Sequence, residues 1–256
     1  MSAPKVSKIN RLMQEWHKGS IMLSSFLQSK GYQKDLLKKY VNSGWLDSLG
    51  YGAYKLANDE VNLYSAINAL QTQKESKIHP GGKTALELKG YSHYIKQGNT
   101  RAEIFYGMDE VIPRWFITQS WKETIEAYAT KIFSYDESKI FIQLDIKNVS
   151  VKISSPELAI MEMLYLVPKI HSFEEADLII ESLTTLRGEL LQNLLEKCNS
   201  VKVKRTFLYL AEKHKHSWLQ DIDQTKIYLG SGKREIVKNG RLDKKYNITV
   251  PRENEG

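Results

Sequence analysis

The chain has 256 residues, of which 41% are apolar and 26% charged, a composition typical of a globular protein with one large domain or two of ordinary size. No apolar run approaches the roughly 20 residues that a membrane-spanning helix requires, and the first residues lack the apolar core of a signal peptide. The single cysteine, Cys198, excludes an intramolecular disulfide and a cysteine-rich zinc site. We therefore expect a cytoplasmic protein without a membrane partner, in which Cys198 is a buried structural thiol.

The net charge of +7 is concentrated at the two ends of the chain. Residues 1–60 contain nine basic and five acidic residues, and residues 201–252 contain thirteen basic and five acidic residues. Residues 61–200 contain fifteen basic and eighteen acidic residues, so the middle is slightly acidic. Two basic ends favour a polyanionic partner, nucleic acid in particular, although a basic face that only meets solvent is an alternative.

The N-terminal quarter of the sequence has the pattern of three helices, a short strand and a hairpin. Apolar residues at helical spacing predict helices over residues 5–17 and 34–42, and the apolar run SIML between them predicts a short strand. Ser24 or Ser25 is expected to cap the second helix, in SFLQSKG, which ends at Gly31. Alternation in WLDSL, followed by the turn GYG, predicts a hairpin that returns through AYKL.

This order of elements is that of a winged helix-turn-helix, in which the hairpin is the wing and the last helix enters the major groove of DNA. The wing would meet phosphate or the adjacent minor groove. The alternatives are that the lysines of the third helix only face solvent, or that the module docks a protein. We expect Trp45 and Tyr54 to be core residues that attach the hairpin to the helices. The polar candidates on the third helix and the wing are Lys34, Lys38, Lys39, Asn42, Tyr51 and Lys55.

The middle of the chain predicts a mixture of helices and strands. A helix is expected in NLYSAINALQTQ, and another begins near Lys83, after a Pro-Gly-Gly break. Aromatic and β-branched residues then predict five strands, in EIFYG, PRWFITQSW, IEAYATKIF, KIFIQLDI and VSVKI.

The C-terminal part of the chain is predicted to be mainly helical. Ser155 is expected to cap a helix with Pro156 at its first position, and further helices are expected over residues 173–182, 186–197 and 201–213, before a strand-like tail. The fold class is therefore α+β. An N-terminal winged helix-turn-helix over residues 1–75 is followed by a larger mixed α/β domain over residues 76–256.

No group of residues in the sequence forms a convincing catalytic or metal site. GGKT at residues 81–84 is similar to the end of a phosphate-binding loop, but that motif needs a glycine where Lys77 stands. A helix that begins after a Gly-Gly turn is therefore favoured. His214 and His216 are two residues apart, a spacing that fits no zinc pair, and they predict a flexible basic helix end. His79 has no acidic or cysteine partner nearby in the sequence. We therefore expect no enzyme activity, no metal and no cofactor.

A second basic block near the C-terminus is a candidate surface. Three of its cations begin the helix expected from residue 201, and the others lie in a glycine-punctuated segment around LGSGKR. Backbone N–H groups and cations of this kind bind phosphate, but the block equally suits docking of an acidic protein, or a face that meets only solvent. The residues of this possible second basic surface are Lys202, Lys204, Arg205, Lys233, Arg234, Lys238, Arg241, Lys244 and Lys245.

Four segments, in order, resemble the AbiEi family of abortive-infection antitoxins, and the resemblance extends over nearly the whole chain. The segments are LSSFLQSKGYQKDLLKKYVNSGWLDSLGYGAY, IHPGGKTALELKGYSHYI, SPELAIMEMLYLVP and FEEADLIIESLTTLR. The resemblance implies a winged-helix domain joined to a larger antitoxin domain in a bacterial type IV toxin–antitoxin system. Such an antitoxin binds inverted repeats in its own promoter and represses the operon, and its partner is a nucleotidyltransferase-like toxin.

The resemblance carries DNA-binding roles only to positions of the winged helix. These are Ser24, Ser25, Lys34, Lys38, Lys39, Asn42, Tyr51 and Lys55. Tyr51 stands where an arginine is common at the tip of such wings, which bears on how deeply the wing enters the minor groove. In a type IV system the antitoxin need not bind the toxin. An alternative function is therefore that of an interaction module that neutralises its toxin by direct binding through the C-terminal domain.

Overall fold

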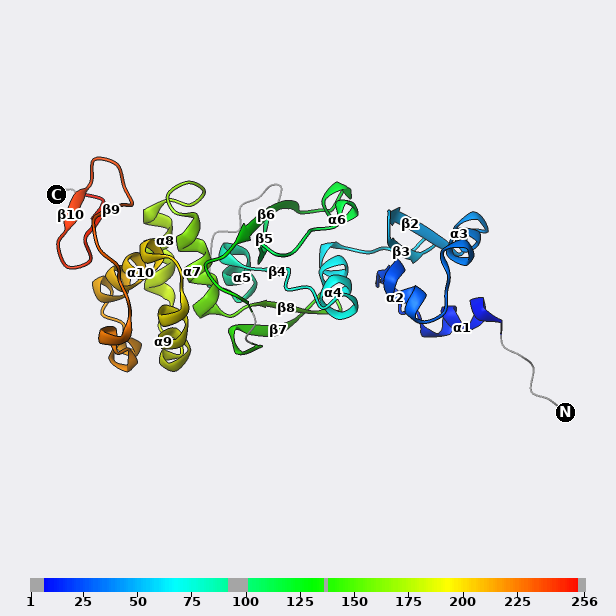
Figure 1. Cartoon of the computed structure of the whole chain (residues 1–256), viewed down its shortest axis with the longest axis horizontal. Helices are drawn as coiled ribbons and strands as arrows, with labels where there is room; N and C mark the ends of the chain where they lie inside the picture. The colour runs from blue at the N-terminus through cyan, green and yellow to red at the C-terminus, as the bar shows by residue number, and fades with distance from the viewer. Residues whose placement is uncertain (1–6, 92–100, 136–137, 253–256) are drawn as a thin grey trace. The chain divides into compact units, whose positions relative to one another are not determined.

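The computed structural model describes residues 7–91, 101–135 and 138–252 (Figure 1). The chain forms two compact units. The first comprises the chain up to Ile78 together with residues Glu110–Thr124 and Leu144–Val151, and the second comprises residues His79–Asp109, Ile125–Gln143 and those from Lys152 onward. Helices and strands occur in both units, which confirms the α+β fold class.

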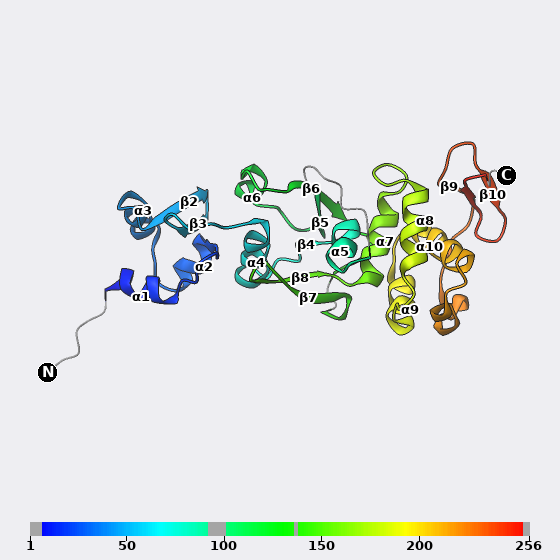
Figure 2. The ribbon, with the colours of Figure 1, turned by 180° about the vertical axis from the view of Figure 1, so that it is seen from behind.

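The N-terminal elements of the first unit are those of a winged helix-turn-helix (Figures 1 and 2). They are α1 (Lys8–Glu15), β1 (Met22–Leu23), α2 (Ser24–Ser29), α3 (Lys34–Asn42), β2 (Leu46–Gly50) and β3 (Ala53–Leu56). The strands pair antiparallel in the order β1-β3-β2. The order of these helices and strands agrees with the prediction, and α3 has the predicted bounds. The first helix is shorter than predicted, and residues 5 and 6 lie outside the described residues.

An apolar core joins the three helices to the hairpin. Its most buried members are Leu12, Leu27, Leu37 and Leu46. Tyr54 packs against this core from a partly buried position, as predicted. The prediction that Trp45 is a core residue is wrong, because 49% of this residue is exposed. Trp45 precedes β2, and the inward-facing positions of the strand are Leu46 and Leu49.

The start of α2 differs from the expected serine cap. The residue that precedes the helix is Leu23, the last residue of β1, and no side chain caps the helix. Because the chain passes directly from strand to helix, the N–H of Ser24 donates to the carbonyl of Gly52 at 2.8 Å instead. The expected end of the helix is confirmed, since Gly31 follows the C-cap with φ +88°.

Two helices from later in the sequence also belong to the first unit. α4 (Leu63–Gln73) begins with a capping box of Asn62 and Ser65, and the Gln73 amide bonds the backbone of Ile21 and Leu23 at 2.8 Å. α6 (Arg114–Thr118) occupies a segment that was predicted as a strand from its aromatic and β-branched residues. That prediction is wrong because the adjacent residues Trp115 and Phe116 are both buried, whereas neighbouring strand residues face opposite sides.

The strands that follow α4 in the chain lie in small sheets. β4 (His79–Pro80), β5 (Arg101–Gly107) and β6 (Thr124–Thr130) form a sheet in that order, and β7 (Phe141–Ile146) pairs with β8 (Val149–Ser154). Near the C-terminus, β9 (Arg234–Glu235), β10 (Arg241–Asp243) and β11 (Ile248–Val250) form a sheet in the order β10-β11-β9. The predicted strands are therefore confirmed except for the segment that forms α6.

The second unit also contains a series of helices. They are α5 (Gly82–Leu88), α7 (Pro156–Leu166), α8 (Phe173–Ser182), α9 (Gly188–Lys197) and α10 (Val201–Lys213), with the 3₁₀ turns Ser138–Ile140, Ser217–Asp221 and Gln224–Lys226. The hydroxyl of Ser155 accepts the N–H of Leu158 at 3.3 Å, and Pro156 is the first helical residue, which confirms the predicted cap. α8 and α10 have the predicted bounds.

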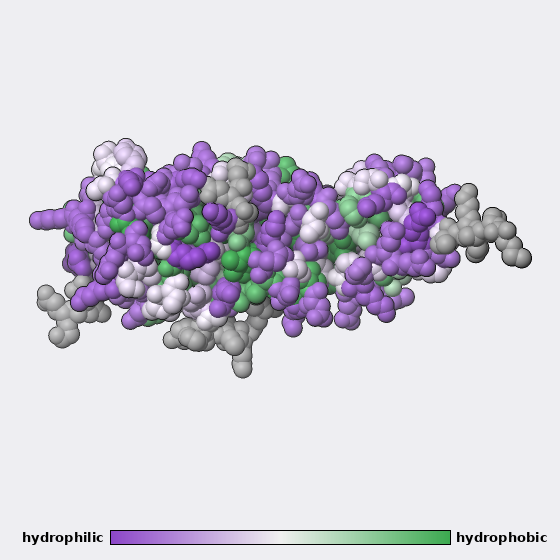
Figure 3. All heavy atoms as spheres, turned by 90° about the horizontal axis from the view of Figure 1, so that it is seen from below, coloured by the Kyte–Doolittle hydropathy of each residue, from purple (hydrophilic) through white to green (hydrophobic). Residues whose placement is uncertain are grey.

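Burial and surface agree with two further expectations. Cys198 is buried, and burial raises the pKa of its thiol to about 11, so this thiol is unreactive at neutral pH. Among the described residues, every helix is too short or too polar to cross a membrane. Figure 3 shows hydrophilic side chains over most of one face, with smaller hydrophobic areas between them.

Candidate nucleic-acid interface

The third helix separates an apolar side from a cationic one. Leu37 and Tyr40 face the core and are buried, whereas Lys34 and Lys38 are exposed. Residues four apart lie on the same side of a helix, so the two lysines form a pair one turn apart. α3 therefore presents two ammonium groups on one surface while its other side fixes the helix to the core.

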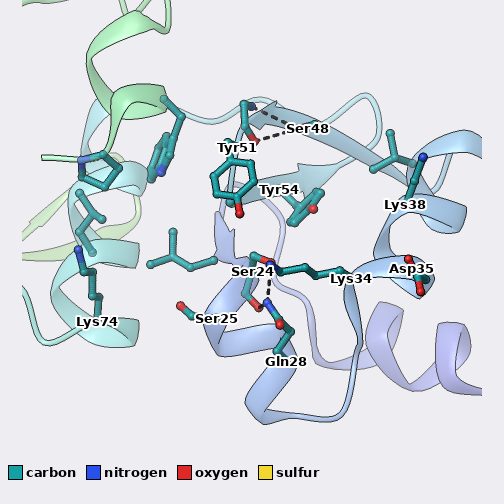
Figure 4. A pocket seen from close by; sticks show the side chains of 17 residues that line it. Ser24, Ser25, Gln28, Lys34, Asp35, Lys38, Ser48, Tyr51, Tyr54 and Lys74 are labelled. Atoms are coloured by element: carbon teal, nitrogen blue, oxygen red, sulfur yellow. Dashed lines mark hydrogen bonds between the residues drawn. The ribbon is translucent and has the colours of Figure 1, made fainter.

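A cavity of about 750 Å³ opens between α2, α3 and the hairpin (Figure 4). Five residues predicted from the sequence to bind DNA line it, which are Ser24, Ser25, Lys34, Lys38 and Tyr51. Figure 4 shows the Lys34 side chain reaching across the cavity from α3. Three elements thus bring hydroxyl groups, ammonium groups and an aromatic ring to one concave surface.

The wing tip is the most exposed part of this surface. Tyr51 is 91% exposed and stands between Gly50 and Gly52, whose φ angles of +122° and +92° L side chains rarely adopt. The Ser48 hydroxyl donates to the carbonyl of Gly50 at 3.0 Å and accepts its N–H at 3.2 Å. The ring of Tyr51 is therefore held out from a tight turn at the rim of the cavity.

Three of the predicted DNA-binding residues lie outside the cavity lining. Lys39 and Asn42 are exposed on other parts of α3, since successive helix residues are rotated by about 100°. Lys55 is used within the domain: its ammonium group forms an ion pair with Asp47 at 3.0 Å and donates to the carbonyl of Asp59 at 2.6 Å. These contacts leave Lys55 less available to a ligand than Lys34 or Lys38.

The structure adds residues that the sequence did not indicate. Gln28 lies one turn after Ser24, bonds its hydroxyl at 2.9 Å and lines the cavity, so helical spacing could have identified it. Lys74, at the end of α4, and Trp115, in α6, also line the cavity. No local signal predicts these two, because only the fold brings their helices to the hairpin.

The arrangement suits an extended polyanion better than a small molecule. Lys34, Lys38 and Lys74 bring three positive charges to the lining, against the single carboxylate of Asp35. Ammonium and hydroxyl groups bind phosphate oxygens, which supplies affinity without regard to sequence. Lysine also reads guanine and aspartate reads cytosine from the major groove, so the first turn of α3 offers both kinds of contact.

The possible second basic surface is smaller than the sequence indicated. Lys204 and Arg205 are buried, so the expectation that they are surface cations is wrong. The Arg205 guanidinium donates to the carbonyls of Leu229, Gly230, Gly232 and Asn247 at 2.6–3.2 Å. The C-terminal segment folds over α10 and uses this cation as an internal hydrogen-bond donor.

Lys202 is also engaged within the fold. Its ammonium group donates to the carbonyls of Tyr165 and Val167 near the end of α7, and burial lowers the pKa of Lys202 to about 8. The other six cations of the block are exposed; they are Lys233, Arg234, Lys238, Arg241, Lys244 and Lys245. Lys245 forms an ion pair with Glu212, and Arg241 bonds the hydroxyl of Tyr209 at 3.3 Å.

The GGKT turn binds carboxylates of the chain itself. The N–H of Gly82 donates to Glu162 at 3.0 Å, and the N–H of Lys83 donates to Glu103 at 2.8 Å. Glu162 also accepts from His79 at 2.9 Å and from Ser154 at 2.7 Å. The turn therefore begins a helix, as predicted, and its N–H groups hold buried carboxylates. The neighbouring sequence indicated no acidic partner for His79, but the fold brings Glu162 to it from 83 residues away.

Two further histidines of the second unit, among the residues that the structure describes, are held by hydrogen bonds within the fold. His171 bonds Glu103 at 2.6 Å and Glu175 at 3.1 Å. The prediction of a flexible helix end at residues 214–216 is wrong, because His216 is buried, stacks on Trp218 and bonds the carbonyl of Ile180 at 2.7 Å. Among the residues that the structure describes, no three or more His, Cys, Asp or Glu side chains are grouped so that they could hold a metal ion.

Comparison with known proteins identifies the family. Residues 99–251 match the model of a transcriptional regulator described as the AbiEi antitoxin of a type IV toxin–antitoxin system, and residues 5–97 match the model of its N-terminal domain. A search of curated proteins finds no match.

A solved structure supports the fold. The RV2827C protein from Mycobacterium tuberculosis is similar with a TM-score of 0.61 and 11% sequence identity, over 94% of this chain and 88% of that one. At this identity the similarity concerns the fold alone. The two family models together span nearly the whole sequence, and the family is non-enzymatic. The chain belongs to the AbiEi antitoxin family of transcriptional regulators in type IV toxin–antitoxin systems.

Proposed function

We propose that the chain represses its own operon in the cytoplasm by binding inverted repeats in the promoter. In this proposal residues 1–75 form the DNA-binding domain and residues 76–256 form the antitoxin domain, which counteracts a nucleotidyltransferase-like toxin. The observation that carries the proposal is the convergence of Lys34 and Lys38 with Ser24, Ser25 and Tyr51 on one cavity. Repression follows because a protein bound across the promoter excludes the polymerase.

The chemistry of binding divides between the elements of the winged helix. α3 enters the major groove, where Lys34, Asp35 and Lys38 meet base edges or phosphates. Ser24 and Ser25 contact the backbone beside it, and Tyr51 reaches the adjacent minor groove from the wing tip. Phosphate contacts make the affinity depend on salt, since each neutralised phosphate releases counterions.

The test compares two double variants that lose the same charge. Fluorescence anisotropy with the promoter duplex is measured at several salt concentrations for Lys34→Ala with Lys38→Ala, and for Lys89→Ala with Lys131→Ala, whose lysines are exposed in the second unit. We expect about tenfold or greater weakening for the first variant and a salt slope lower by about 2, since each phosphate contact contributes about 0.9. Equal affinities and slopes for both variants would disprove the proposal.

A second candidate function is direct binding of the toxin by the C-terminal segment. Leu242 and Tyr228 are 45% and 76% exposed in the segment that carries Lys233, Arg234, Lys238 and Lys244. Exposed apolar groups among cations suit an acidic protein surface. The test is co-purification of the neighbouring gene product with Lys233→Glu plus Arg234→Glu. Loss of the complex with promoter binding intact supports direct neutralisation, and no complex with the wild type excludes it.

A further inference from the structure

The turn of the wing is packed against α6. A Cβ atom on Gly50 would lie 2.9 Å from Cβ of Trp115, closer than real Cβ contacts allow, so the glycine permits the helix to touch the wing backbone. One turn later along this segment, the side-chain amide of Gln119 donates to the carbonyl of Leu49 at 2.5 Å. The wing is thus held by one close packing contact and one hydrogen bond, both within the first unit.

These contacts come from a distant part of the sequence that is itself well fixed. Trp115 is 4% exposed and packs edge-on against Phe116 at a ring separation of 6.0 Å. The N–H of Gln119 bonds the carbonyl of Trp115 at 3.2 Å. The wing belongs to the matched N-terminal domain, residues 5–97, whereas Trp115 and Gln119 belong to the region matched by the larger model, residues 99–251.

The wing needs such a support. A two-stranded hairpin is marginally stable alone, and the third strand of this sheet, β1, has only two residues and pairs with β3. The pairing is irregular between Ser48 and Gly50, just before the tip. An unsupported tip would have to be ordered at the moment of binding, and that ordering lowers affinity.

We propose that Gln119 and Trp115 are positioning residues for DNA recognition, which fix the wing so that Tyr51 meets the duplex in a preformed orientation. The inference rests on the proposed function and adds to it a dependence of the wing on the C-terminal family region. Neither residue needs to touch DNA, because both act through the backbone of Leu49 and Gly50. The operator affinity of the N-terminal domain is thereby set in part by residues beyond it.

The experiment is a double-mutant cycle in the full-length chain. Promoter affinity is measured for the wild type, Gln119→Met, Tyr51→Ala and the double variant, with Gln220→Ala as the control for an exposed glutamine. Methionine keeps the length of the side chain and removes the donor. We expect Gln119→Met to weaken binding about three- to tenfold, the usual effect of one hydrogen bond, and to have no further effect once Tyr51 is alanine.

A hydroxyl-radical footprint provides a readout that a merely structural role would not change. Gln119→Met should lose protection at the backbone positions that Tyr51→Ala also loses, and keep protection elsewhere in the site. The inference would be overturned if the losses of affinity in Gln119→Met and Tyr51→Ala added in the double variant, or if Gln119→Met left affinity and footprint unchanged. Either result would leave the lysine-dependent binding of the wild type intact. If the wild type itself fails to bind the promoter, both the proposed function and this inference fall.

Discussion

A Cβ atom on Gly81 would lie 2.3 Å from a carboxylate oxygen of Glu162, although the two residues are far apart in the sequence. The same atom would lie 2.7 Å from the ring of Phe105. The glycine therefore leaves the space into which a fully buried carboxylate fits, where it accepts hydrogen bonds from His79, Gly82 and Ser154. The packing explains why two glycines stand at this turn.

Gly81→Ala is expected to destabilise the second unit. The new methyl group displaces Glu162 from its donors, and we expect a loss of about 2–4 kcal/mol from overpacking and broken hydrogen bonds. The measurement is thermal unfolding followed by circular dichroism. The control is Gly232→Ala, where the nearest atom to a Cβ is 3.5 Å away and only the φ of +75° is strained, at about 1 kcal/mol. Equal losses for the two variants would contradict the prediction.

The contribution of His171 to stability should fall as pH rises. Burial opposes the charged imidazole, but hydrogen bonds and charges of Glu103 and Glu175 outweigh it and raise the pKa of His171. Both ring nitrogens can donate to these carboxylates only when the ring is protonated. A raised pKa in the folded state gives a stabilisation that is full below about pH 6.5, the unfolded value, and is lost through the folded pKa.

The measurement is the difference in melting temperature between the wild type and His171→Gln from pH 6 to pH 9. Burial opposes ionisation of Glu175 as well, but the hydrogen bond from Lys83 lowers the pKa of this carboxyl, so it stays charged across that range. We expect the difference to shrink steadily toward pH 9. A difference that stays constant or grows with pH would show that the ring is not held in its charged form.

Arg205→Lys should loosen the C-terminal segment. A planar guanidinium satisfies carbonyls on several sides, whereas one ammonium group cannot reach all four acceptors. We expect a loss of about 2–3 kcal/mol and faster amide hydrogen exchange over residues 229–250. Arg234→Lys, at an exposed position, is the matched control and should leave both measurements unchanged. Normal exchange in Arg205→Lys would show that these hydrogen bonds do not hold the C-terminal segment in place.

Local signals in the sequence predicted most of the secondary structure. The bounds of α3, α8 and α10 agree with the prediction because apolar residues recur at helical spacing, and Ser155 and Gly31 correctly mark where α7 begins and α2 ends. The segment of α6 shows the limit of such signals. Its aromatic and β-branched residues favour a strand when taken alone, and packing in the first unit makes it a helix.

The candidate site was predictable to the extent that it lies on one helix and its adjoining hairpin. Lys34, Lys38 and Tyr51 follow from helical spacing and from a turn flanked by glycines. Lys74 and Trp115 could not be predicted, because their place at the cavity depends on how α4 and α6 pack. Lys55 could not be discounted either, since its partners Asp47 and Asp59 are brought to it by the fold.

The sequence by itself determined the order of the elements, the family and the basic character of both ends of the chain. The tertiary structure decided which cations are exposed and which, like Arg205, are buried and bonded to backbone carbonyls. It also decided which carboxylates accept hydrogen bonds from the Gly-Gly turn. The physical reason is the distance along the chain over which each interaction acts. Helix, turn and cap preferences act between near neighbours, whereas the desolvation of a charge depends on partners that only folding brings within a few ångströms.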